Sequence, residues 1–193
     1  MTRFLLFLWL VVPFWTPTAG LAAGPFDIRL PAAGVSVDRN ALTVVGRPQE
    51  YTLQKGENLL DIARNYGLGY LELGNIYRHW DPFLPPAGAR IIIPTMWIVP
   101  SRPQTQMVVN TGEMRLYYFQ DNFTKVITYP IGMGVLDFKT PTGKFKVVGK
   151  KTNPAWHIPA SLQAKYGTSV MPPGPDNPLG EYKLTLSWGD YGI

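Results

Sequence analysis

The chain has 193 residues, of which 46% are hydrophobic and 16% are charged, an ordinary globular composition with room for one or two domains. It contains no cysteine, which excludes disulfides and thiol chemistry within these residues. The 19 glycines and 19 prolines favour many short strands and turns over a helical bundle.

The first segment is typical of an export signal. One Arg precedes an apolar run over 4–15, small residues follow, and we expect a signal peptide over 1–23 with cleavage near Ala22 or Ala23. A transmembrane anchor is the alternative, but the run is short and contains Pro13. We therefore expect an exported protein of the periplasm or cell envelope, with no membrane span once the signal is removed.

The charge of the mature chain would allow contact with an anionic envelope or matrix polymer. Removal of residues 1–23 takes away one Arg and no acid, which leaves 17 basic and 13 acidic residues, a net charge of +4. The basic residues are scattered along the sequence, and we expect no nucleic-acid binding.

The next elements follow in chain order. Residues 24–50 are predicted to be an extended lead-in that could include one strand. Residues 51–94 show the order strand, helix, helix, strand. The first helix is predicted from apolar residues at i, i+3, i+4 and i+7, with Asn58 as its N-cap and Gly67 as its end: Leu59, Ile62, Ala63 and Tyr66. A second short helix is expected around 71–76, and "IIIP" is expected to be the second strand.

The remainder is predicted to be antiparallel β. A linker over 95–106 leads to strands in "QMVVN", "MRLYYF", "KVITYPIGMG", "TGKFKVVGKK" and "EYKLTLSW". A long Pro-rich loop over 153–180 separates the last two strands, and long loops inside compact domains are often functional. Trp156, Pro173 and Gly174 in this loop are candidates for a substrate groove, with plain loop packing as the equal alternative.

Residues 51–94 resemble a LysM domain through "YTLQKGENLLDIARNYG" and "LPPAGARIIIP". The resemblance implies binding of N-acetylglucosamine-containing glycans such as peptidoglycan, in a groove between two loops. "NIYRHW" departs from the Asn-containing helix end of that family, and Glu57-Asn58 replaces its usual Asp-Thr pair. The implied glycan contacts are Gly56, Glu57, Asn58, Leu59, Asp81, Pro82 and Phe83.

Residues 107–193 resemble the L,D-transpeptidase (YkuD-like) catalytic domain through "VVNTGEMRLYYF", "YPIGMG", "TPTGKF", "NPAW" and "PPGPDNPLG" in the family's order. The implied fold class is α+β, a small strand-helix-helix-strand unit followed by a mainly antiparallel β-sandwich domain. The implied chemistry is peptidoglycan remodelling without a cofactor or metal. A Cys paired with a His forms a thioester with the stem peptide and passes it to diaminopimelate or to a lysine of an outer-membrane lipoprotein.

The end of the chain, "LTLSWGDYGI", stops where the family continues into its His-Gly and Ser-x-Gly-Cys-x-Arg motifs. We therefore expect a C-terminally truncated chain whose catalytic Cys and His lie beyond Ile193. The chain as given would be inactive, with an open apolar edge on its last strand that favours aggregation. His79 and His157 are not at the position of the family's base, and Ser161 and Lys165 lack the Ser-x-x-Lys spacing.

Two other interpretations stay open from the sequence. The chain could be a non-catalytic periplasmic protein that binds peptidoglycan, with a degenerate β domain. It could also bind chitin-type glycans in general, which a comparison of chitin oligomers with muropeptides would separate.

Overall fold

The computed structural model describes residues 23–29, 43–100, 105–134, 140–188 and 192, so the predicted signal peptide lies almost wholly outside the described residues. The chain divides into two compact units, Met1–Phe138 and Lys139–Ile193. The domain limits at residues 51, 94 and 107 remain a prediction from the sequence.

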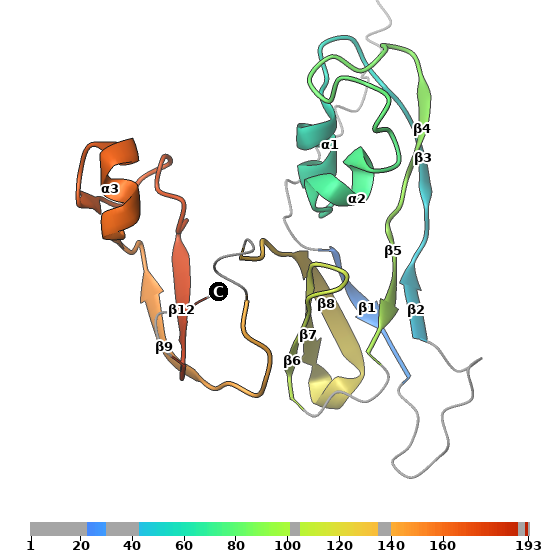
Figure 1. Ribbon diagram of the computed structural model, residues 1–193. Helices are drawn as coiled ribbons and strands as arrows, with labels where there is room; N and C mark the ends of the chain where they lie inside the picture. The colour runs from blue at the N-terminus through green and yellow to red at the C-terminus, as the bar shows by residue number, and fades with distance from the viewer. Residues whose placement is uncertain (1–22, 30–42, 101–104, 135–139, 189–191, 193) are drawn as a thin grey trace, which may run out of the picture. The chain divides into compact units, whose positions relative to one another are not determined.

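A four-stranded antiparallel sheet lies in the first unit (Figure 1). Its order is β1 (Ala23–Asp27), β8 (Lys125–Pro130), β7 (Arg115–Gln120) and β6 (Met107–Asn110), with a short 3-10 turn, η1 (Asp121–Phe123), between β7 and β8. The predicted β6–β7 hairpin is confirmed, and the Asn110 side chain forms its turn by accepting from the backbone N–H of Gly112 at 3.1 Å. The described chain is mostly antiparallel β with few helices, as predicted.

A second antiparallel element is a long two-stranded ribbon (Figure 1). It consists of β2 (Thr43–Gly46) paired with β5 (Met96–Val99), and β3 (Gln49–Thr52) paired with β4 (Arg90–Ile93). The register is the same in both pairs. β2 and β3 therefore form one side of the ribbon and β4 and β5 form the other, with a single break in the strand pairing. Pro48 and Pro94 lie at the interruption, where they cannot donate backbone hydrogen bonds to the ladder.

Thr95 closes this interruption with its side chain. Its hydroxyl donates to the carbonyl of Arg47 at 2.6 Å and accepts from the Gln49 amide at 3.0 Å. Thr95 is 6% exposed, so these bonds satisfy polar groups that are buried. The ribbon therefore stays paired across two prolines.

The structure has more strands in two segments than the sequence predicts. The lead-in over 24–50 contains β1, β2 and the start of β3, and the linker over 95–106 contains β5. The strands were missed because each has only four or five residues and lies beside prolines, which suggested loops. Their partners are also distant in sequence, so no local signal marks the pairing.

The two predicted helices are confirmed. α1 (Leu59–Asn65) begins after Asn58, whose side-chain oxygen accepts from the backbone N–H of Asp61 at 2.8 Å. Gly67, with a φ of 65°, follows its end, and α2 (Tyr70–Gly74) comes next. The helices lie beside β3 and β4 in Figure 1.

One hydrophobic core runs through the first unit. Its buried members come from the helices, from the ribbon and from the sheet: Ile28, Val45, Leu53, Leu59, Ile62, Ala63, Leu68, Leu73, Ile91, Ile93, Trp97, Val99, Tyr117, Phe119 and Val126. Trp97 of β5 and Phe26 of β1 are in ring contact, with centroids 6.1 Å apart. The strand-helix-helix-strand segment is thus packed on the first part of the β region.

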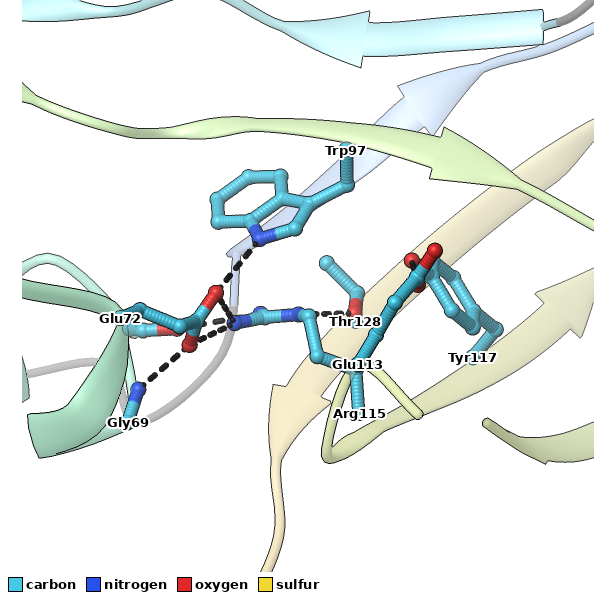
Figure 2. Close-up of polar contacts among 8 residues, drawn as sticks. Gly69, Glu72, Trp97, Glu113, Arg115, Tyr117 and Thr128 are labelled. Atoms are coloured by element: carbon cyan, nitrogen blue, oxygen red, sulfur yellow. Dashed lines mark hydrogen bonds and ion pairs between the residues drawn. The ribbon is translucent and has the colours of Figure 1, made fainter. Parts of the chain in front are cut away.

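A buried ion pair lies at this junction (Figure 2). Arg115 of β7 is 1% exposed, and its Nη1 donates to both carboxylate oxygens of Glu72 on α2, at 3.0 and 2.8 Å. Its Nε donates to the Thr128 hydroxyl at 2.9 Å and its Nη2 to the Gly67 carbonyl at 3.1 Å. Each guanidinium nitrogen therefore has a partner, as a buried charge requires.

Glu72 has partners of its own in this network. Its carboxylate also accepts from the indole N–H of Trp97 at 3.1 Å and from the backbone N–H of Gly69 at 2.6 Å. The Arg115 guanidinium carbon lies 4.3 Å from the centre of the Trp97 ring, a cation–π contact. Burial lowers the pKa of Arg115 and the Glu72 carboxylate opposes this shift.

The second unit has a two-stranded sheet of β9 (Val147–Thr152) and β12 (Tyr182–Leu186). Between them come β10 (Trp156–His157), α3 (Ala160–Tyr166) and β11 (Val170–Met171), and β10 pairs with β11. The sequence predicts a long Pro-rich loop over 153–180, whereas the structure has two short strands and a helix there. α3 was missed because prolines surround it, although Gly167 with a φ of 68° ends it in the expected way.

We predict that Arg115→Met destabilises the protein by about 3–5 kcal/mol, because it leaves the Glu72 carboxylate without its buried counter-ion. Urea unfolding would measure the loss. The double variant R115M/E72M should lose less than the sum of the two single changes, since it removes both charges together.

The matched control is the exposed pair Arg64–Asp61 on α1, whose side chains are 64% and 58% exposed. Arg64→Ala should cost no more than about 0.5 kcal/mol. Equal losses from R115M and R64A would contradict the role given to the buried pair.

Candidate functional site

The two segments predicted to bind glycan lie next to each other. The backbone N–H of Leu59 donates to the Pro82 carbonyl at 2.8 Å, which joins the Gly56–Leu59 turn to the Asp81–Phe83 loop. Leu59 is buried, while Gly56 and Phe83 are exposed. The structure thus brings together segments separated by more than twenty residues, and glycan binding there remains a prediction.

The polar side chains of this site are already used within the protein. Glu57 accepts from the Tyr51 hydroxyl at 2.6 Å and from the backbone N–H of Gln54 at 2.7 Å. Asn58 caps α1 and its Nδ2 donates to the Asp61 carboxylate at 2.7 Å. These two residues therefore shape the turn, and a ligand would have to meet other groups.

The groups that remain accessible are backbone and apolar. Gly56 has a φ of 89°, and a Cβ added there would meet nothing within 4 Å, so its backbone is open to an approaching ligand. Phe83 is 64% exposed and Leu84 is 79% exposed, and the Asp81 carboxylate fixes the loop by accepting from the Phe83 N–H at 2.9 Å. An open backbone beside an exposed ring suits a sugar, which offers hydroxyl and acetamido groups and an apolar ring face.

An aromatic cluster beside this loop was not predicted from the sequence. Tyr77 and Trp80 stack with centroids 5.1 Å apart, and His79 contacts Trp80 edge-on at 5.0 Å. The Tyr77 hydroxyl accepts from the backbone N–H of Ile92 at 2.6 Å and so covers the outer edge of β4. His79 is exposed, as expected of a surface or groove residue.

The second group of candidates lies in the second unit. Trp156 contacts Tyr166 of α3 edge-on at 5.0 Å, while Pro173 and Gly174 are exposed. His157 is also exposed. Trp156 is therefore packed on a helix, and a groove role for these three residues remains a prediction.

Asn177 organises this segment and was missed by sequence reasoning. It is 5% exposed, and its Nδ2 donates to the carbonyls of Pro154 at 3.0 Å, Pro172 at 3.1 Å and Met171 at 3.4 Å. Its Oδ1 accepts from the backbone N–H of Leu179 at 2.9 Å. The only sequence signal is an Asn between prolines, which is also typical of an ordinary turn.

Within the ranges that the structure describes, no group of three or more His, Cys, Asp or Glu side chains could hold a metal ion. The same ranges contain no helix with the length and apolar character needed to cross a membrane.

Comparison with known proteins gives a family match for the β region. Residues 104–193 match the L,D-transpeptidase catalytic domain, the YkuD family. This match includes β6 to β12 and therefore extends over both compact units.

Curated relatives carry the same family name. The chain is 36% identical to the probable L,D-transpeptidase YcfS of Escherichia coli K12 over 140 residues, 68% of this chain and 44% of that protein. It is 36% identical to the probable L,D-transpeptidase YbiS of the same organism over 74% of this chain and 50% of that protein. A probable L,D-transpeptidase ErfK/SrfK of Salmonella typhimurium is 31% identical over 74% of this chain and 49% of that protein. The chain thus spans about half the length of these relatives.

Among solved structures, a probable carnitine operon oxidoreductase CaiA from Brucella melitensis has a TM-score of 0.38 at 19% identity, over 77% of this chain and 68% of that chain. A likeness this low carries no argument about fold or function.

The Tyr51–Glu57 hydrogen bond gives a prediction about pH. Burial, followed by the hydrogen bond and charge of Glu57, raises the pKa of Tyr51 from 10.0 to about 12. The native state then binds this proton more tightly than the unfolded chain does. Its stabilisation is complete below pH 10 and is lost as the pH rises to about 12.

We expect the free energy of unfolding, measured with urea, to fall over this pH window and to fall less in Glu57→Gln. The glutamine removes the negative charge, so Tyr51 should titrate nearer its ordinary pKa, which the ultraviolet absorbance of tyrosinate reports. An unchanged tyrosine titration in E57Q would show that Glu57 does not set this pKa.

Proposed function

We propose that this protein is an L,D-transpeptidase of bacterial peptidoglycan remodelling. The observation that carries the proposal is the match of residues 104–193 to the catalytic domain, together with relatives of that name at 36% identity. In this proposal the protein is exported to the periplasm. A Cys nucleophile with a His base breaks the peptide bond before the terminal D-alanine of a tetrapeptide stem, releases that D-alanine and holds the rest of the stem as a thioester. An amine, either of diaminopimelate or of a lipoprotein lysine, then takes the acyl group and frees the thiol.

The 193 residues supply the part of that function that holds substrate. They contain no Cys, and so they provide no thiol for an acyl-enzyme. They do contain the adjacent loops of Gly56–Leu59 and Asp81–Phe83, which we propose as a LysM-like site for the glycan strand. The open backbone at Gly56, the exposed ring of Phe83 and the exposed side chain of Leu84 support this.

A second function, non-catalytic binding of peptidoglycan or another N-acetylglucosamine glycan, is supported by the same pair of loops. The coding DNA distinguishes the two. A downstream reading frame with His-Gly and Ser-x-Gly-Cys-x-Arg would favour the transpeptidase, and a genuine stop after codon 193 would favour the binding protein.

We predict that the purified 193-residue chain leaves tetrapeptide muropeptides unchanged, because it has no Cys thiol for the acyl transfer. Chromatography of the muropeptides and an assay of free D-alanine check this. Release of D-alanine by the chain would show that another residue performs the chemistry.

We also predict that Phe83→Ala weakens retention on purified peptidoglycan sacculi by at least about fivefold at high salt, since it removes an exposed aromatic contact. Co-sedimentation would measure retention. Ile98→Ala is the matched control, because Ile98 is 47% exposed on the ribbon and lies outside the two loops.

If the wild-type chain is retained and F83A is retained as well as I98A, the glycan site does not lie in these loops. Absence of retention in the wild-type chain at every salt concentration would contradict peptidoglycan binding by these residues and with it the second function.

A further inference from the structure

The basic charge of this chain is concentrated in its second unit. Residues 139–193 contain seven Lys, no Arg and three acidic residues, a net charge of +4. Residues 1–138 contain 11 basic and 10 acidic residues and are close to neutral. The basic residues are scattered along the whole sequence, but most of the excess of basic over acidic residues lies in the second unit.

Within that unit, several lysines lie on or beside the strands β9 and β12, which Figure 1 shows as a paired ribbon. Lys150 and Lys151 lie on β9, Lys183 lies on β12, and Lys146 directly precedes β9. The pairing register places Lys183 directly opposite Lys151. Residues directly opposite in an antiparallel pair project from the same face, so these two ammonium groups share one face of the ribbon.

This arrangement is unfavourable without an anion. Like charges directly opposite each other destabilise an antiparallel pair. Among the described residues, no acidic side chain forms a salt bridge with Lys151 or Lys183, and the three ion pairs found there all belong to the first unit. The second unit therefore has unbalanced positive charge on a regular, hydrogen-bonded surface.

The neighbouring side chains set which face is available. Lys150 points to the opposite face, where its ammonium lies 4.9 Å from the centre of the Tyr182 ring. On the Lys151–Lys183 face the next pair is Gly149 with Thr185, a small glycine and a hydroxyl. Gly192 lies against the stem of Lys183, since a Cβ added to it would come within 3.3 Å of the Lys183 Cε. The two ammonium groups thus lie beside a polar surface that has only small side chains.

We propose that the Lys151–Lys183 face of the ribbon binds carboxylates of the peptidoglycan peptide stems. This inference rests on the proposed function and adds to it a second contact with the same polymer. The glycan backbone is largely neutral, whereas the stems have several free carboxylates, and a pair of ammonium groups matches two of them. Lys suits this task, because its ammonium is a strongly hydrated point charge with three donors that can meet carboxylates in variable positions.

The test is co-sedimentation of the full chain with purified sacculi over a series of salt concentrations. Lys151→Gln with Lys183→Gln should weaken retention at low salt by at least about tenfold, because each Lys near an anionic surface contributes appreciably to binding. The same double variant should match the wild-type chain at high salt, where exposed charges are screened.

The matched control is Lys125→Gln with Lys165→Gln. It removes the same number of positive charges, one from β8 and one from α3. It should retain the wild-type salt dependence. A second arm uses sacculi whose carboxylates have been converted to amides, and these should lose the salt-dependent part of the binding to the wild-type chain.

Two outcomes would overturn the inference alone. One is a salt dependence of K151Q/K183Q equal to that of K125Q/K165Q. The other is unchanged binding to the amidated sacculi, which would point to phosphate-bearing polymers as the anion. In both cases, high-salt retention that depends on Phe83 would leave the proposed function standing. Absence of all retention would remove both this inference and the proposed glycan site.

Discussion

The burial of the Arg115 guanidinium is the constraint on which the first unit depends. A charge that is 1% exposed loses several kcal/mol of hydration, and the loss is offset only while every donor keeps its partner. The partners come from α2, from the α1–α2 connection and from β8, and Trp97 of β5 covers the guanidinium. Movement of any of these elements would therefore leave a buried charge without its hydrogen bonds.

This constraint determines how the candidate glycan loops are held. Both loops adjoin the helical pair, and α2 is joined to the sheet by Glu72. The ribbon also joins the helices to the sheet. Its β3–β4 part shares the hydrophobic core with the helices. Its β2–β5 part contacts the sheet where Trp97 of β5 meets Phe26 of β1. A glycan bound at these loops would have a fixed orientation relative to β6–β8, unlike a ligand on a flexibly tethered module.

The sequence predicts the elements whose signals are local. The Asn58 cap, the helical spacing after it and the Gly67 end are all contained in ten residues, and α1 forms as predicted. The β6–β7 hairpin is likewise recorded in one short stretch. By contrast, a charged Arg115 in a strand gives no sign of burial, because its partner Glu72 lies 43 residues away. The same limit applies to Asn177 and to β5, whose roles depend on distant carbonyls and strands.

The two units differ in what stabilises them, and this difference bears on how each could meet a polymer. Among residues 140–188 only Pro154, Ile158 and Asn177 are buried, so strand pairing and the Asn177 hydrogen bonds carry more of the order there than apolar packing does. An exposed, regular ribbon of this kind offers little shape for a sugar to fit, but it can present charges at fixed spacing. The first unit offers the opposite, a nearly neutral surface with an open backbone and exposed apolar side chains. Contact through the first would be short-ranged and specific, whereas contact through the second would be longer-ranged and sensitive to salt.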